Sequence, residues 1–111
     1  GELYLRDGRI GDRQVVSETW VERSWVPRGV SRISGQRYGY GWWMRDLAGH
    51  QAYFAWGFGG QYIIIVPDLE LVVVTTSAST VAEDRRTHRR TLFELVEDLV
   101  IAPLSVASSA E

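Results

Sequence analysis

Residues 53–66 read YFAWGFGGQYIIIV, two apolar runs on either side of a glycine-bearing turn. Both runs are rich in the aromatic and β-branched residues that favour strands. Gly57, Gly59 and Gly60 allow positive φ angles or a close approach by another backbone, and a tight hairpin or bulge needs one or both. A ligand lying along the strand edge would need the same glycines. The segment therefore predicts a hairpin around residues 58–60 and leaves open whether a ligand binds there.

The composition is that of one small globular domain. The chain has 111 residues, of which 45% are hydrophobic and 23% are charged, and its formal net charge is −2. This balance is typical of folded chains and gives no argument for binding nucleic acid. The apolar runs are too short to span a membrane. We therefore expect neither a nucleic-acid partner nor a membrane span.

Three residue types are absent, and each absence excludes some chemistry. Without cysteine there are no disulfides, thiol nucleophiles or cysteine-bound metals. The 12 lysine and arginine positions are all arginine, so there is no lysine, and there is also no asparagine. These residues alone cannot carry out a mechanism that needs a lysine as base, Schiff-base amine or phosphate ligand. The sequence indicates no cofactor and no metal.

The N-terminal third predicts helices and loops. Leu3, Tyr4 and Leu5 suit the end of a helix, and Ser17 is a suitable N-cap for a second helix over residues 18–25. Residues 27–37 are polar and contain glycine, which predicts a surface loop.

The rest of the chain predicts an antiparallel sheet and a closing helix. The strands, with no helix within 60–77, are expected at residues 38–46, 51–57, 60–66 and 71–77. Short connections and near-continuous apolar runs favour pairing in sequence order, with both faces covered. Leucine and valine recur at helical spacing over residues 82–102, which predicts a helix on one face that Pro103 ends. We expect one α/β (α+β) region over residues 1–111, with 103–111 as a frayed tail.

The order of these features resembles the C-terminal part of serine β-lactamase-like hydrolases. The resemblance is carried by YGYGWW at residues 38–43 together with GFGGQYIIIVPDLELVVV at residues 57–74. Both motifs at this spacing are fairly specific, and the resemblance extends over residues 1–102. The family includes class C β-lactamases, penicillin-binding-protein-like enzymes, related esterases and 6-aminohexanoate-dimer hydrolases. Many members are periplasmic or secreted; no compartment follows from the residues themselves.

The resemblance implies a partial β-lactamase/transpeptidase-like fold and an acyl-enzyme mechanism. Family members carry the nucleophile in a Ser-x-x-Lys motif and a proton-transfer residue in Tyr-x-Asn or Ser-x-Asn. Neither motif can occur in a chain without lysine and asparagine. We therefore expect the nucleophile to lie upstream of this chain and the chain alone to be inactive. The implied partners are that upstream segment and a small-molecule ester or amide substrate.

A third family motif, Lys-Thr-Gly or His-Thr-Gly, aligns best with residues 55–57, where only the glycine matches. Ala55 offers no charge to a substrate carboxylate. By the same alignment the backbone N–H of Phe58 would be one oxyanion-hole donor, a role that tolerates any side chain. Gly57 would let an acyl group lie close to the strand. The resemblance thus implies a substrate site formed by Ala55, Trp56, Gly57, Phe58, Gly59 and Gly60.

The arginine run and the two histidines are weaker signals for other kinds of site. Arginines bind phosphate and carboxylate well, but the RRTHRR run at 85–90 is flanked by Glu83, Asp84, Glu94, Glu97 and Asp98. A solvated, partly salt-bridged helix face is therefore favoured over a nucleic-acid site. His50 and His88 form no recognisable zinc motif, and a Ser-His-Asp triad would lack a Gly-x-Ser-x-Gly elbow.

Two further expectations concern function and association. The alternative to a hydrolase is a non-catalytic binding or structural domain derived from the same fold, which the uncharged Ala55 favours. The apolar run LVVVTT at residues 71–76 would present an open strand edge, which invites another strand. We therefore expect the isolated chain to associate with itself as a homo-oligomer unless the upstream segment covers this edge.

Overall fold

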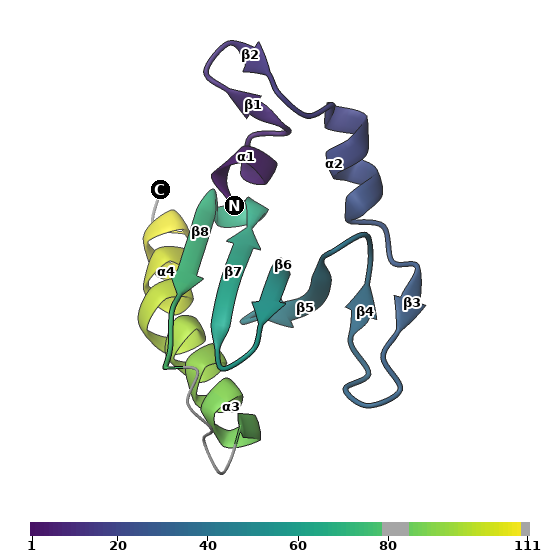
Figure 1. The fold of residues 1–111 in the computed structure, drawn as a ribbon. Coiled ribbons are helices and arrows are strands. Elements are labelled where there is room, and N and C mark those ends of the chain that lie inside the picture. Colours follow the sequence, from purple (N-terminus) through teal and green to yellow (C-terminus); the bar gives the residue numbers. More distant parts are fainter. Residues whose placement is uncertain (79–84, 110–111) are drawn as a thin grey trace.

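The computed structural model describes residues 1–78 and 85–109 (Figure 1). In chain order the elements are α1 (Glu2–Leu5), β1 (Arg9–Ile10), β2 (Arg13–Gln14), α2 (Glu18–Ser24), β3 (Gly29–Val30), β4 (Arg37–Tyr38), β5 (Trp43–Leu47), β6 (His50–Gly57), β7 (Gln61–Val66), η1 (Pro67–Leu69), β8 (Leu71–Thr75), α3 (Arg85–Leu95), η2 (Val96–Ile101) and α4 (Ala102–Ser109). No helix in these described ranges is long and apolar enough to cross a membrane.

Strands β3 to β8 form one antiparallel sheet in which spatial order follows chain order. The predicted strands at 51–57, 60–66 and 71–77 correspond to β6, β7 and β8, and their antiparallel pairing is confirmed. One detail is wrong, because a single 3₁₀ turn, η1, lies between β7 and β8 where we expected no helix. Pro67 sits at its start, where a fixed φ and a missing N–H are tolerated, and Glu70 ends it in a left-handed conformation.

The strand predicted over 38–46 is wrong in its first half. The chain reverses at residues 39–42, so that β4 pairs back onto β5. Gly41 has a φ of 82°, and a Cβ on Gly39 would lie 2.1 Å from the carbonyl oxygen of Ser24. The glycines of this aromatic motif therefore form a turn against α2 and do not interrupt a continuous strand.

The loop predicted over residues 27–37 is wrong at both ends. β3 and β4 lie there and pair with each other as two-residue antiparallel strands. All four of their residues are exposed, so neither strand has an apolar face that a periodic pattern could show.

The first helices agree better with the sequence. α1 covers residues 3–5, and the N-cap role of Ser17 is confirmed because its Oγ accepts a hydrogen bond from the Trp20 N–H at 3.1 Å. Val21 and Ser24 are buried on the inner side of α2.

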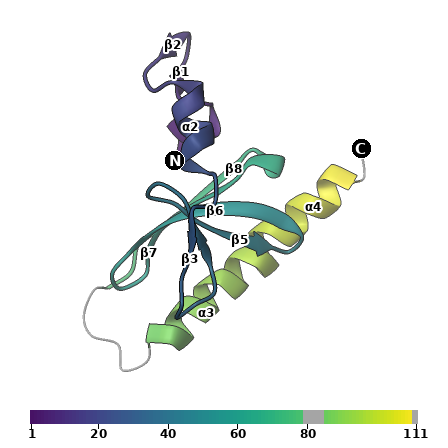
Figure 2. The same ribbon diagram turned by 90° about the vertical axis from the view of Figure 1, so that its right-hand side faces the viewer.

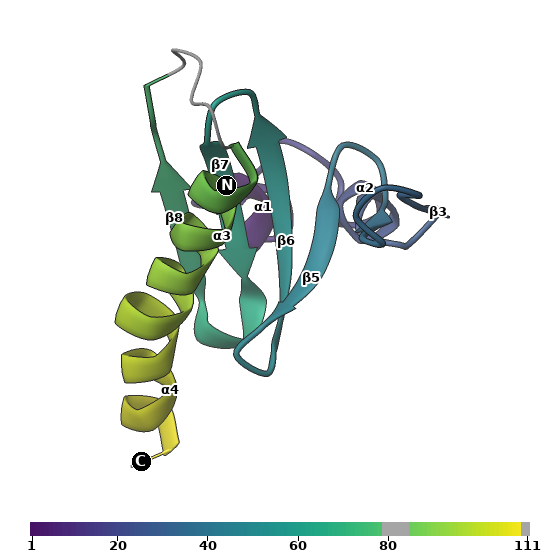
Figure 3. The ribbon, with the colours of Figure 1, turned by 90° about the horizontal axis from the view of Figure 1, so that it is seen from below.

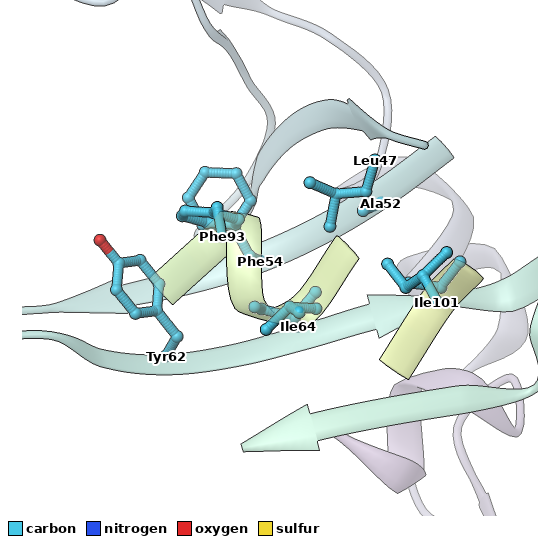
Figure 4. Close-up of a cluster of buried hydrophobic side chains, with 9 residues drawn as sticks. Leu47, Ala52, Phe54, Tyr62, Ile64, Phe93 and Ile101 are labelled. Carbon is cyan, nitrogen blue, oxygen red and sulfur yellow. The ribbon is translucent and has the colours of Figure 1, made fainter. Parts of the chain in front are cut away.

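The main core lies between the sheet and the C-terminal helices. Figures 2 and 3 show α3 and α4 running as one rod along a single face of the sheet. Figure 4 shows the side chains packed there, which are Leu47, Ala52, Phe54, Tyr62, Ile64, Val66, Phe93, Val96 and Ile101. The Phe54 ring centroid is 5.2 Å from that of Phe93 and 6.0 Å from that of Tyr62. The prediction that the helix packs on one face is confirmed.

Aromatic side chains cover the opposite face. Tyr53 alternates with Phe54 along β6 and so points away from the main core. Its ring stacks on that of Trp25, with the ring centroids 4.1 Å apart. The Trp25 ring in turn meets the Trp42 ring edge-on, with the centroids 6.3 Å apart. The ring centroid of Tyr4 in α1 lies 4.9 Å from that of Trp42. The N-terminal elements therefore supply the second layer that the apolar strands require.

The sequence predicted that Pro103 ends the C-terminal helix, and this prediction is wrong. α3 passes into the π-helical segment η2, and α4 continues to Ser109. A proline lacks the N–H that an α-helix uses, and a local change of helical pitch is one way to accommodate it. Residues 103–109, expected in a frayed tail, are therefore helical; residues 82–84 of the predicted helix and 110–111 lie outside the described residues.

β8 is the last strand of the sheet in the described part of the chain, and Val74 on it is 63% exposed. Self-association through this edge stays a prediction.

Candidate functional site

A pocket of about 480 Å³ lies where the β6–β7 turn meets the start of α3. Its volume is in the range of small-molecule sites. The lining residues are Trp56, Gly57, Phe58, Gly59, Gly60, Tyr62, Ala78, Arg85, Arg86, His88 and Arg89. Five of the six residues that the sequence assigned to substrate binding, 56–60, are thus brought together here.

Ala55 is not among the lining residues. Side chains alternate along a strand, so Ala55 lies on the face opposite Phe54 and Trp56. It pairs with Ile63 of β7. The position aligned with the charged residue of the family motif therefore points away from the pocket.

The turn itself explains two of the glycines without a ligand. Gly59 and Gly60 have φ angles of 86° and 100°, a region that side-chain-bearing residues rarely adopt. Gly60 is buried, and a Cβ on it would lie 2.8 Å from both His88 Nε2 and Ser77 Oγ. The tight turn brings the backbone close to α3 and so forms the floor of the pocket.

A polar network holds this turn. The Gly60 carbonyl accepts hydrogen bonds from Thr75 Oγ1 at 2.9 Å and from Ser77 Oγ at 3.2 Å. Because the Ser77 hydroxyl donates to Gly60, its oxygen is left to accept from His88 Nε2, 3.2 Å away. The Gln61 side chain donates to the Ser77 carbonyl at 2.6 Å and accepts from the Ser77 N–H at 3.0 Å. The turn is thereby tied to both β8 and α3.

Two arginines of α3 lie over exposed aromatic rings, one at the end of β6 and one in the β6–β7 turn. The Arg85 guanidinium carbon is 4.3 Å from the centroid of the Phe58 ring, and that of Arg89 is 4.9 Å from the Trp56 ring. These distances are typical of cation–π contacts. The Trp56 ring also stacks on that of Tyr62, with the ring centroids 6.2 Å apart, so the pocket wall contains both aromatic and guanidinium groups.

A family model described as Beta-lactamase matches residues 2–97. This chain belongs to the beta-lactamase family. The match includes both motifs that carried the resemblance, and it confirms the recognition and the fold class, an antiparallel sheet with flanking helices. A search of curated proteins finds no match to the chain.

In this beta-lactamase-family chain, sequence reasoning missed half of the pocket. It treated the run 85–90 as a solvated, partly salt-bridged helix face, whereas Arg85, Arg86 and Arg89 line the pocket. An i, i+4 pair of Arg90 with Glu94 would fit such a face, but it is not among the ion pairs of residues 1–78 and 85–109. Arg85 and Arg89 contact Phe58 and Trp56, which lie far earlier in the chain, so only the tertiary structure places these arginines beside the pocket.

Burial raises the pKa of the Tyr62 hydroxyl, although the positive charges of Arg89 and Arg45 act in the opposite direction. The phenol is therefore neutral at physiological pH, and it is a hydrogen-bond donor or acceptor on the pocket wall, not a base. Phe58, whose backbone N–H is the expected oxyanion donor, borders the same pocket. Within the described ranges, no group of three His, Cys, Asp or Glu side chains could hold a metal ion.

A second polar cluster of the beta-lactamase-family chain lies at the other end of β6. His50 Nε2 is 2.8 Å from Ser105 Oγ, and His50 Nδ1 is 3.5 Å from Asp68 Oδ2. The order of atoms is that of a Ser-His-Asp triad. However, Ser105 lies inside α4 and donates its hydroxyl proton to the Ile101 carbonyl at 3.0 Å, and none of the three triad-like residues lines the pocket. The cluster therefore ties α4 to β6 and η1.

Proposed function

We propose that this chain supplies the substrate-binding wall of a serine hydrolase that acts on an ester or amide through an acyl-enzyme. One observation carries the proposal. The segment at 56–60, which includes the only match to the third motif, lines a pocket of ligand size in a chain of the beta-lactamase family. The exposed rings of Trp56 and Phe58, which are 42% and 57% exposed, offer an apolar surface to an acyl group.

The nucleophile in this proposal comes from outside the chain. A serine activated by lysine is impossible here, because the chain contains no lysine. Ser77 lies next to His88, but its hydroxyl proton is directed to the Gly60 carbonyl and it does not line the pocket. The contribution of this chain would be the Phe58 N–H as an oxyanion donor and the close approach that Gly57 permits.

Gly57→Val tests the proposal in the polypeptide extended upstream in its own gene. By the alternation along β6, a Cβ at Gly57 lies on the same face as Ala55 and 2.9 Å from Gln61 Cβ, so the larger side chain should displace the turn that lines the pocket. We expect kcat/KM for a chromogenic ester to fall by about tenfold or more, since small misplacements of a reacting group have effects of this size. The matched control is Gly29→Val, where a Cβ meets nothing within 4 Å. If Gly57→Val hydrolyses the ester as fast as Gly29→Val, substrate does not bind along this turn.

A non-catalytic binding domain of the same family is the second candidate. The observation that favours it is Ala55, which is uncharged and faces away from the pocket. An extended polypeptide that carries no Ser-x-x-Lys motif and shows no acyl-enzyme burst would support this candidate.

A further inference from the structure

We propose that the pocket binds a flat organic carboxylate, with the carboxylate held by Arg85 and Arg89 and the apolar body packed on Trp56 and Phe58. The inference rests on the proposed function in taking this carboxylate as part of the substrate. Binding of the carboxylate itself requires no catalysis and can be measured on the chain alone.

The described lining of the pocket is positively charged. Among the residues that the structure describes, three arginines and one histidine line the pocket, and no aspartate or glutamate does. None of Arg85, Arg86 and Arg89 forms an ion pair with another residue of the ranges 1–78 and 85–109. Arg85 and Arg89 are four positions apart on one helix, a spacing at which like charges destabilise each other. An anion in the pocket would offset this repulsion.

Arg85 and Arg89 are positioned to bind one anion together. Residues four apart lie on the same face of a helix, so Arg85 and Arg89 both extend over the β6–β7 turn. Each guanidinium is held over an aromatic ring, at 4.3 Å and 4.9 Å respectively. A guanidinium positioned in this way keeps N–H groups that can bind both oxygens of a carboxylate. Because the aromatic contacts already restrict the side chains, little conformational entropy is lost on binding.

The aromatic part of the pocket suits the apolar body of the ligand. Trp56 and Phe58 are two large aromatic side chains that remain 42% and 57% exposed within the pocket. Their rings can bury a flat apolar group but gain nothing from a small inorganic ion. The pocket therefore favours an organic carboxylate over inorganic phosphate.

The test is a calorimetric titration of the chain with benzoate, benzamide and inorganic phosphate. Benzoate and benzamide have the same flat shape and differ in charge. We expect benzoate to bind about tenfold more tightly than benzamide, because hydrogen bonds between charged groups are worth more than neutral ones. We also expect phosphate to bind more weakly than benzoate. Equal affinity for benzoate and benzamide would overturn the carboxylate site, and tighter binding of phosphate would overturn the organic ligand.

Two charge-matched variants locate the site. Arg89→Gln and Arg90→Gln each remove one positive charge from α3, but Arg90 does not line the pocket. We expect Arg89→Gln to weaken benzoate binding about tenfold and Arg90→Gln to leave it unchanged. If both variants weaken binding equally, benzoate responds to the general field of the helix and the proposal is wrong. Either result leaves the hydrolase proposal to the ester assay with Gly57→Val, so the two can fail separately.

Discussion

Phe54→Ala should lower the free energy of unfolding by about 3–5 kcal/mol, the range for removing a buried aromatic ring. The Phe54 side chain is 1% exposed and lies at the centre of the main core. Its ring contacts Tyr62 on β7 and Phe93 on α3, so it joins the sheet to the helix that lines the pocket. Urea denaturation followed by circular dichroism measures the change.

Phe58→Ala is the matched control, because it removes the same side chain four residues later. Phe58 is 57% exposed, and its described aromatic contact is with Arg85. An exposed cation–π contact contributes about 0.5–1 kcal/mol, so we expect a loss of that order. Similar losses for the two variants would contradict the position of the core between β6, β7 and α3.

Gly60→Ala should lower the free energy of unfolding by about 2–4 kcal/mol, because backbone strain and a steric clash act together. The φ of Gly60 is 100°, and the new Cβ would lie 2.8 Å from Ser77 Oγ and His88 Nε2. These atoms belong to flexible side chains, so they should move away and break the contact that ties the turn to α3. We therefore also expect Gly60→Ala to weaken benzoate binding.

Gly49→Ala separates the strain from the clash. Gly49 has a φ of 87°, but a Cβ there meets nothing within 4 Å. A left-handed conformation alone costs about 1–2 kcal/mol for a residue with a side chain. If Gly49→Ala destabilises the chain as much as Gly60→Ala, and Gly60→Ala still binds benzoate normally, the turn is not held against α3 as described.

The long apolar strands were predictable because the residues within each strand favour an extended, buried conformation. The runs at 51–57, 60–66 and 71–77 are apolar enough to require burial, and short connections leave antiparallel pairing as the simple outcome. β3 and β4 are exposed two-residue strands: the turn at 39–42 brings β4 back onto β5, and β3 then pairs with β4. The helix continues past Pro103 through a π-helical segment, whereas the local rule for proline had predicted an end there.

The candidate site divides in the same way. The glycine turn was visible in the sequence, since positive φ angles demand glycine at residues 59 and 60. The arginines were not, because helical spacing shows only neighbours on the same helix and suggested acidic partners nearby. Their contacts with Trp56 and Phe58 arise from the packing of α3 on the sheet. The His50–Ser105 contact, across 55 positions, is equally a product of tertiary structure.

We propose that this chain forms the pocket of a serine hydrolase whose nucleophile lies outside it. A fluorophosphonate probe that labels activated serines tests the claim, with intact-protein mass and peptide mapping as the readout. The 111-residue chain should remain unlabelled, and the polypeptide extended upstream in its own gene should gain one adduct on a serine that precedes these residues. Stoichiometric labelling of a serine within the chain, such as Ser77 or Ser105, or an extended polypeptide that takes up no probe, would contradict the account.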